Sequence, residues 1–156
     1  MSDAATPGER SPTAEEALHA TLDMAFDEAV DTVQLEHELA GFETVKVTRL
    51  DHLVKGALEE EVRRTALIVV CHAGIARDAV ELDQRTAGLL PCTTAVYEDE
   101  EGTVHVHHLS ATKAIRDLGC TDSDPEAVER LVEYTGERMA EVWSNVERLA
   151  ADSAAD

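Results

Sequence analysis

Seven consecutive residues, TALIVVC at 65–71, constrain the fold more than any other part of this chain. Apart from Thr65 the run is apolar throughout, and it lies between the polar residues Arg64 and His72. A strand with one solvated face alternates apolar and polar residues, whereas a strand covered on both faces does not. We therefore expect residues 65–71 to form a strand at the centre of a sheet, buried on both faces.

Further strands and helices are predicted on either side of this run. Alternation with a period of two predicts strands, and apolar residues at helical spacing predict helices. Strand patterns occur at 19–24, at 44–50 and on both sides of an acidic turn within 93–109. Helical patterns occur at 25–39, 52–64 and 75–82, and a long one occupies 124–150.

These patterns predict an α+β fold: one small, mainly antiparallel sheet packed against helices, with a long C-terminal helix. A chain of 156 residues suits one domain with a single core. We place that domain at 14–151. Residues 1–13 and 152–156 are polar and charged without periodicity, and we predict that they are disordered tails.

Acidic residues dominate the charge, with 33 Asp and Glu against 13 Lys and Arg and a formal net charge of -20. Such a field repels the phosphates of nucleic acid and anionic lipid, and aromatic residues (3%) are too few for a base-stacking surface. We therefore exclude nucleic-acid binding. An acidic, Lys-poor composition is typical of haloarchaeal-like proteins from salt-rich cytoplasm, where salt screens self-repulsion. The alternative is an acidic mesophilic protein.

The sequence predicts neither export nor a membrane anchor. No segment approaches the ~20 apolar residues that a membrane-spanning helix needs, and residues 1–17 are too polar and acidic for a signal peptide. Three irregularly spaced cysteines do not make a disulfide framework. We expect a cytoplasmic protein with free thiols.

Cys71 and Cys92 flank the predicted helix at 75–82 and are candidates for a shared metal site. If the helix carries the chain back to the starting edge of the sheet, the two thiols lie roughly 15–20 Å apart at opposite ends. Zinc binds sulfur at about 2.3 Å. We therefore expect no shared site within one subunit.

Cys71 alone is a candidate catalytic nucleophile. It ends a predicted strand just before a helix that begins near Gly74, where unpaired N–H groups and the helix dipole lower the pKa of a thiol. His72 is its neighbour and is a candidate base or cation. The alternative is that Cys71 is a small buried residue of the core, as unpaired cysteines commonly are.

His105 and His107 are predicted to share one face of the last hairpin strand, because strands alternate with a period of two. Such a pair can bind a transition metal or supply an axial ligand to haem. We expect the hairpin to bring His105 toward the same sheet edge as Cys71 and His72, with His52 as a further candidate ligand. The alternative is a solvated strand face.

Two neighbouring features are assigned to structure rather than to a site. His108 is predicted on the opposite, valine-rich face of the same strand. The acidic run at 98–101 lacks the ligand spacing of an EF-hand and predicts a solvated turn. The chain also has no Gly-rich phosphate loop, no G-x-S-x-G elbow and no H-E-x-x-H motif.

The segment ALIVVCHAGIARDAVELDQRTAGLLPCTTAVYEDEEGTVHV (66–106) resembles the core of the DUF302 family, small proteins of uncharacterised function. In that family a strand ending in Cys precedes a short helix, and a Leu-Pro-Cys then leads into a strand and an acidic hairpin. The matching residues here are Cys71, Ala76 to Ala79, Leu90-Pro91-Cys92, Val96-Tyr97-Glu98 and Gly102.

The upstream segment GFETVKVTRLDH (41–52) is also similar to the family, so the resemblance covers roughly residues 22–118. This chain departs from the family at His72-Ala73, where Asn-Pro commonly follows the first Cys. The resemblance implies a compact α+β fold and a homodimer, and it brings no established activity.

Three functions follow as hypotheses. The first is a dimeric module that binds a small ligand or a metal near Cys71, His72, His105 and His107. The second is an enzyme with a redox-active thiol at Cys71, whose ionisation His72 or His52 tunes. The third is a structural or partner-binding dimer without a small-molecule site.

Overall fold

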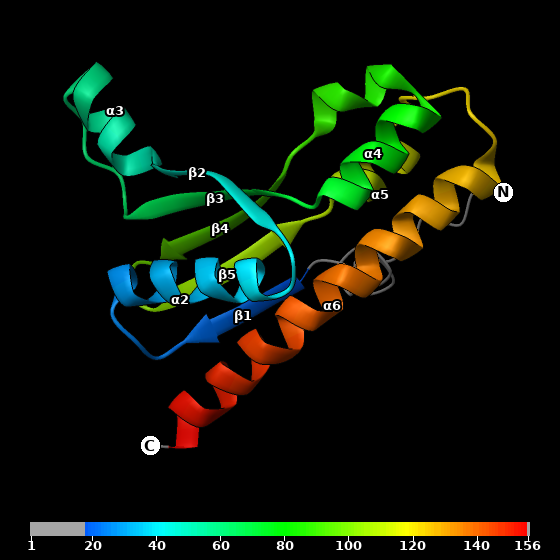
Figure 1. The fold of residues 1–156 in the computed structure, drawn as a ribbon. Coiled ribbons are helices and arrows are strands. Elements are labelled where there is room, and N and C mark those ends of the chain that lie inside the picture. The colour runs from blue at the N-terminus through cyan, green and yellow to red at the C-terminus, as the bar shows by residue number, and fades with distance from the viewer. Residues whose placement is uncertain (1–17, 156) are drawn as a thin grey trace, which may run out of the picture.

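The described part of the chain, residues 18–155 of a computed structural model, contains a five-stranded antiparallel sheet with the strand order β1-β5-β4-β3-β2 (Figure 1). The strands are β1 (Leu18–Leu22), β2 (Glu43–Arg49), β3 (Thr65–Cys71), β4 (Cys92–Glu98) and β5 (Val104–Leu109). Each pair of neighbours is antiparallel. The predicted sheet and its final hairpin are therefore confirmed.

Helices connect the strands and follow the last of them. They are α2 (Phe26–Leu39), α3 (Leu50–Leu58), α4 (Ala73–Leu82), the 3₁₀-helix η1 (Gln84–Leu89), α5 (Ala111–Asp117) and α6 (Pro125–Ala155). The α+β class and the long C-terminal helix are confirmed. The short helix α5 was not predicted.

The ends of two helices differ from the prediction. Helix α3 stops at Leu58 because Glu59 adopts a left-handed conformation with φ 58°, and Gly56 lies inside the helix without interrupting it. Helix α6 runs to Ala155, through residues predicted as a tail from 152, since its alanines favour helix. The tail predicted at 1–13 lies outside the described residues.

None of the described helices has an apolar stretch long enough to cross a bilayer.

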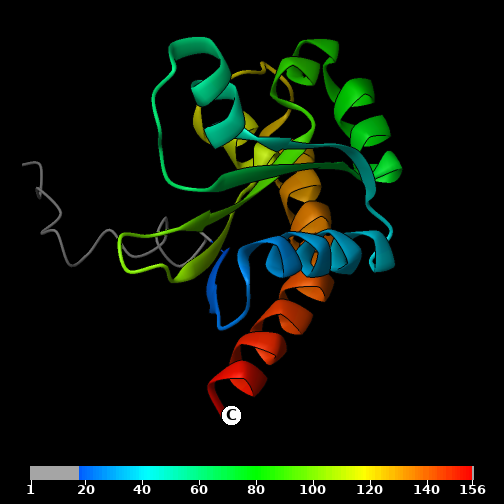
Figure 2. The same cartoon turned by 90° about the vertical axis from the view of Figure 1, so that its left-hand side faces the viewer.

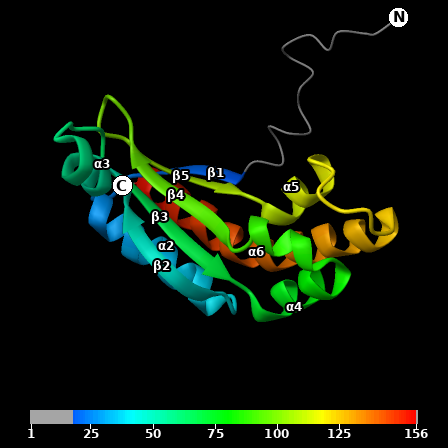
Figure 3. The ribbon, with the colours of Figure 1, turned by 90° about the horizontal axis from the view of Figure 1, so that it is seen from above.

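Helices α2 and α6 pack on one face of the sheet, the inner face, and leave most of the opposite, outer face without a helix over it (Figures 2 and 3). Inward residues of the three middle strands are fully buried: Ala66, Ile68 and Val70 in β3, Val96 in β4 and Val106 in β5. Helix α6 adds Val142 and Val146, also fully buried. The core therefore fills one side of the sheet.

The expectation that β3 is buried on both faces is wrong. Its burial alternates, with Leu67 and Val69 only half-buried on the outer face. The strand is also not central, because β4 holds the middle place in the sheet. Its continuous apolar run therefore places aliphatic side chains on a face that no helix fully covers.

The connection from β3 to β4 also differs from the prediction. The two strands are antiparallel, with Val70 opposite Cys92, so α4 and η1 together turn the chain back at one end of the sheet. A strand–helix–strand crossover would have carried the chain to the other end. This difference decides where the candidate site residues lie.

Arg49 and Asp51 anchor α3 to the sheet. The Arg49 guanidinium donates two hydrogen bonds to the Asp51 carboxylate, at 2.8 and 2.6 Å, and the backbone N–H of Thr65 donates a third at 3.2 Å. Arg49 also lies over the Phe26 ring, 4.7 Å from its centroid. The hydrogen bonds from Arg49 lower the pKa of Asp51 to about 2.

The contribution of Asp51 to stability should depend on pH. Because its pKa is lower in the folded chain than in the unfolded one, the stabilisation is complete above the unfolded pKa and is lost as pH falls toward 2. Asp51→Asn should therefore reduce the free energy of unfolding by about 2 kcal/mol at pH 7, and by steadily less below pH 4. Urea denaturation at each pH measures this. The control Asp27→Asn changes an exposed carboxylate, and an Asp51 effect equal at pH 3 and pH 7 would contradict the assignment.

Candidate functional site

The predicted meeting of Cys71 and His72 with the hairpin histidines is wrong. His105 lies opposite Tyr97, which lies opposite Thr65, so His105 is at the end of the sheet where β3 begins. Cys71 is at the other end of β3, roughly 20 Å away at about 3.3 Å per residue. The two groups therefore belong to separate places in the fold.

Cys71 and Cys92 lie at the same end of the sheet, contrary to the expected separation, because β3 and β4 are antiparallel. They occupy opposite faces: Cys92 is buried in the core beside Val70, whereas Cys71 is half-buried on the outer face. The predicted separation of the two thiols at opposite ends of the sheet is therefore wrong, and they are instead separated by lying on opposite faces.

The environment of Cys71 does not activate its thiol. Burial, followed by the negative charge of Glu43 opposite it, raises the pKa of Cys71. The predicted lowering at the start of α4 is therefore wrong. Burial also raises the pKa of Cys92. Neither thiol is poised as a thiolate at neutral pH.

His72 is packed among aromatic rings between the sheet and α6. Its ring meets Phe42 edge-on at 5.4 Å and Tyr134 at 5.8 Å between centroids. A Cβ added to Gly74 would lie 2.5 Å from the Tyr134 hydroxyl and 3.3 Å from the His72 ring. The Nδ1 atom of His72 is buried without a hydrogen-bond partner. This packing gives His72 a structural role at the start of α4.

His52 lies on α3, with 71% of its side chain exposed and Nε2 3.8 Å from the Asp51 carboxylate. Helix α3 follows β2, at one edge of the sheet, whereas the hairpin histidines are on β5, next to the opposite edge. The structure therefore does not bring His52 together with the other candidate ligands.

The hairpin histidines do meet a third histidine, His19 on β1. Its Nε2 lies 3.0 Å from Nδ1 of His105, and its ring centroid lies 5.9 Å from that of His107. The other ring nitrogen of His105, Nε2, donates a 2.8 Å hydrogen bond to Asp99. Tyr97 stacks on His105, with centroids 5.1 Å apart. The acidic turn thus orients one histidine of an outer-face group.

This outer-face histidine group (His19, His105 and His107) is not a complete metal site. Within residues 18–155, no set of three or more His, Cys, Asp or Glu side chains is arranged to hold a metal ion. Two imidazole nitrogens converge, and the carboxylate behind His105 matches the outer-shell partner that orients many ligating histidines. Further ligands would have to come from water or a second molecule.

A second polar group lies inside the core, on the inner face. Thr94 Oγ1 is 2.9 Å from His37 Nε2 and 2.8 Å from His108 Nδ1, and His37 Nδ1 is 2.7 Å from the carbonyl oxygen of Val33. His37, Thr94 and His108 are at most 2% exposed. We call these three residues the interior relay. It connects α2, β4 and β5.

Burial keeps both relay histidines uncharged at neutral pH. Desolvation lowers the pKa of His108 to about 3, and the neighbouring His37, His107 and Lys113 act in the same direction. Desolvation also lowers the pKa of His37, against a smaller opposing effect of its hydrogen bond to Val33. The Nε2 atom of His108 is buried and has no hydrogen-bond partner.

The His108 ring lines a cavity of about 240 Å³ between the sheet edge, α5 and α6, which we call the His108 cavity. Leu18, opposite His108 on β1, forms one wall. The remaining lining residues are Ser110, Lys113, Thr135, Gly136, Met139 and Ala140. The cavity thus combines apolar walls with a few polar atoms, as small-molecule sites do.

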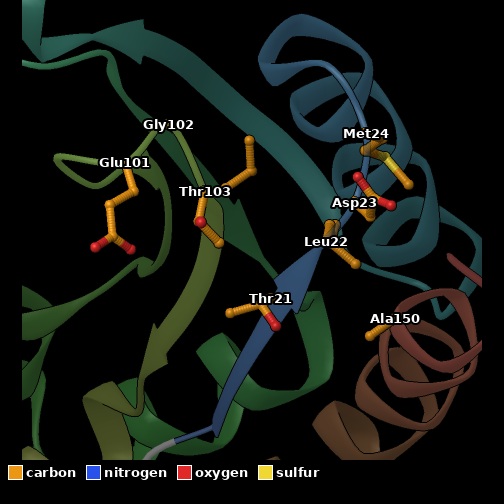
Figure 4. Close-up of a pocket in the computed structure, with 9 residues that line it drawn as sticks. Thr21, Leu22, Asp23, Met24, Glu101, Gly102, Thr103 and Ala150 are labelled. Carbon is orange, nitrogen blue, oxygen red and sulfur yellow. The ribbon is translucent and has the colours of Figure 1, made fainter. Parts of the chain in front are cut away.

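A larger and more open cavity of about 350 Å³ lies at the far end of β1, beside the β4–β5 turn. Figure 4 shows its two carboxylates, Asp23 and Glu101, on different sides of the opening, with Glu101 directed away from Asp23. Because these polar groups do not converge, the cavity does not indicate a particular ligand or reaction.

Sequence reasoning missed the interior relay. His108 was correctly placed on the apolar face but was not considered further. His37 continues the buried stripe of α2 four residues after Val33, where an apolar residue is usual. A polar residue on a buried stripe must find a partner, and this was the available signal.

The fold and these sites define a small α+β protein with a sheet covered mainly on one face, a buried histidine pair and a cavity beside one of these histidines. The family model described as domain of unknown function DUF302 matches residues 18–146. The chain therefore belongs to the DUF302 family.

A solved structure has the same fold: the crystal structure of uncharacterized conserved protein DUF302 from Bacillus stearothermophilus. It is 14% identical, with a TM-score of 0.69, and the alignment covers 81% of this chain and 94% of that one. No curated protein matches the chain. The comparisons thus support the family and the fold without bringing an activity.

Cys71 should react slowly as a nucleophile. Because burial and Glu43 raise the pKa of its thiol, alkylation by iodoacetamide at pH 8 should be several-fold slower than that of free cysteine. Mass spectrometry of peptides after timed quenching gives the rate. The urea-unfolded chain is the control, in which Cys71 should react at the free-thiol rate. Alkylation of the folded chain faster than free cysteine would favour the redox hypothesis instead.

Proposed function

We propose that this chain is a cytosolic binding module for a small organic molecule, and that the His108 cavity is its site. The observation that carries the proposal is that His108, whose buried Nε2 has no hydrogen-bond partner, is one of the residues that line a cavity. Buried polar atoms in native proteins almost always have a partner, so one without any indicates a missing ligand or water.

The form of the cavity supports a ligand rather than water alone. Its volume of about 240 Å³ exceeds the ~30 Å³ that one water occupies in the liquid. It is smaller than the ~300–1,000 Å³ of sites for drug-sized molecules. Leu18 and Met139 supply apolar surface, and Lys113 and Ser110 add polar atoms. A compact ligand with a polar group directed at His108 fits these properties.

Filling the cavity from α6 should abolish ligand binding without unfolding the chain. Gly136 lines the cavity, and a Cβ added there meets no atom within 4 Å, so Gly136→Leu can be accommodated. We expect fragments in an NMR screen to shift the signals of Thr135 and Met139, and Gly136→Leu to weaken them at least about tenfold.

Gly56→Leu is the matched control, because Gly56 is also a helical glycine with open space, on the distant α3. This variant should bind the fragments as the unmodified chain does. Fragments that bind both variants equally, or a screen without any hit at the cavity, would contradict the proposal.

A second candidate function, metal binding by a homodimer, is favoured by the outer face. The outward residues of β3, β4 and β5 include no carboxylate, on a chain with a net charge of -20. They are Thr65, Leu67, Val69, Cys71, Thr93, Ala95, Tyr97, His105, His107 and Leu109. A second copy can approach this carboxylate-free part of the outer face with less repulsion than elsewhere.

Such a dimer would bring two histidine groups together. Nitrogens of His19 and His105 that lie 3.0 Å apart can both reach one ion at about 2.0–2.1 Å. Imidazoles from the second copy would complete the coordination of zinc or another transition metal. Cys71 would take no part, since it lies at the other end of the sheet.

Metal content and mass test this second candidate together. Protein prepared without a His-tag in high salt should hold zinc and show the mass of a dimer in light scattering. The double variant His105→Ala/His107→Ala should lose the metal, whereas His52→Ala, at an exposed histidine on α3, should keep it. A metal-free monomer after incubation with zinc would rule this candidate out.

A further inference from the structure

The lining of the His108 cavity differs in charge from that of three other cavities within residues 18–155. The cavity beside the β4–β5 turn is lined by Asp23 and Glu101. A cavity between α4 and α6 and another beside α3 are each lined by one Asp and one Glu. The described lining of the His108 cavity contains no carboxylate, and Lys113 is its one charged side chain. This lining is therefore positive on a chain whose net charge is -20.

Lys113 is half-buried and unpaired. Lysine side chains are mostly exposed unless they are paired, as Lys55 is with Glu61 at 3.2 Å. Within residues 18–155, Lys113 forms no ion pair although it lies partly out of water. Its charge acts on Asp117, one turn further along α5, but the pKa of Asp117 is lowered mainly by a 2.7 Å hydrogen bond from Arg116. The ammonium of Lys113 is therefore available to an anion from outside the chain.

The charge of Lys113 acts on the cavity wall. Desolvation is the main cause of the lowered pKa of His108, and the charges of His37, His107 and Lys113 add to it. The ring of His108 is consequently uncharged at neutral pH. It cannot neutralise an anion in the cavity, and it does not compete with Lys113 for one.

The hydroxyl groups of the lining already take part in hydrogen bonds. The Thr135 hydroxyl donates to the carbonyl oxygen of Leu131 at 2.9 Å. Ser110 Oγ accepts from the backbone N–H of Lys113 at 3.3 Å and lies 3.1 Å from Thr112 Oγ1. The ammonium of Lys113, which has several N–H donors, therefore has the greatest remaining capacity to donate to a ligand.

The rest of the lining favours an apolar body over a second charge. Leu18, Met139 and Ala140 supply aliphatic and thioether surface. An ion pair against such a wall is screened less than one at the open surface. A phosphate group carries roughly two negative charges and is bound by several donors or by an arginine fork, neither of which this cavity offers. A single carboxylate matches one ammonium.

We infer that the ligand of the His108 cavity is a small monocarboxylate with an apolar body, held by an ion pair between its carboxylate and the ammonium of Lys113. The inference rests on the ligand site proposed above and specifies its chemistry. The carboxylate lies beside the uncharged ring of His108, and the apolar body lies against Leu18 and Met139.

Benzoate and benzamide test the requirement for charge, because they have nearly the same shape and only benzoate is an anion. In NMR titrations at constant salt, followed at Met139 and Ala140, benzoate should bind about tenfold more tightly than benzamide. Equal affinities, or tighter binding of benzamide, would overturn the carboxylate requirement and leave the proposed ligand site standing. Failure of both probes to bind would contradict the ligand site itself.

Variants of Lys113 show whether the preference comes from this side chain. Lys113→Met removes the ammonium and keeps an unbranched chain, so the two probes should bind equally, and an unchanged affinity for benzamide shows that the cavity is intact. Lys113→Arg keeps the charge and should keep most of the preference.

Lys46→Met is the matched control. It removes the same charge from an exposed lysine on β2, at the opposite edge of the sheet from β1 and outside the cavity lining. The preference for benzoate should remain about tenfold in this variant. A preference that survives Lys113→Met, or that Lys46→Met lowers equally, would overturn the inference, since net charge and not the cavity would then decide affinity.

Discussion

The hydroxyl group of Thr94 is the hydrogen-bond partner of both buried histidines in the interior of this protein. Two buried histidines lie on either side of it on the inner face of the sheet, and each would have one more nitrogen without a partner if this oxygen were absent. Since His37 belongs to α2 and His108 to β5, the same oxygen joins the helical layer to the sheet. On a chain with a net charge of -20, the relay is nevertheless uncharged, and the excess charge remains outside the core.

Local patterns predicted most of the elements but not their directions. Alternation over 93–109 and the apolar run at 65–71 gave the strands, because these patterns follow directly from side-chain geometry. The direction of β4 relative to β3 depends on whether the chain turns back after α4. Neither periodicity nor length contains that information, since η1 between Gln84 and Leu89 extends the connection without showing a clear pattern. The wrong direction for β4 placed the β4–β5 turn, and His105 with it, at the same end of the sheet as Cys71.

The candidate site shows the same division between local and tertiary information. Placing His105 and His107 on one strand face, opposite His108, needed only the pleat of a strand. Recognising His19 as their neighbour required the pairing of β1 with β5, and recognising His37 required the docking of α2. Both contacts join residues far apart in sequence. A single sequence offers no signal for such pairs beyond an unexpectedly polar residue on an apolar stripe.

The packing around His72 has a consequence for how sequences in this family vary. The imidazole and the Tyr134 hydroxyl together occupy the space where a side chain at position 74 would begin. These three positions, on the β3–α4 junction and on α6, are therefore not free to change one at a time. We expect a relative with a side chain where this chain has Gly74 to lack the Tyr134 hydroxyl and to have a smaller residue in place of His72, such as the Asn of the family pattern. Substitutions at this corner of the fold would then be inherited as matched sets.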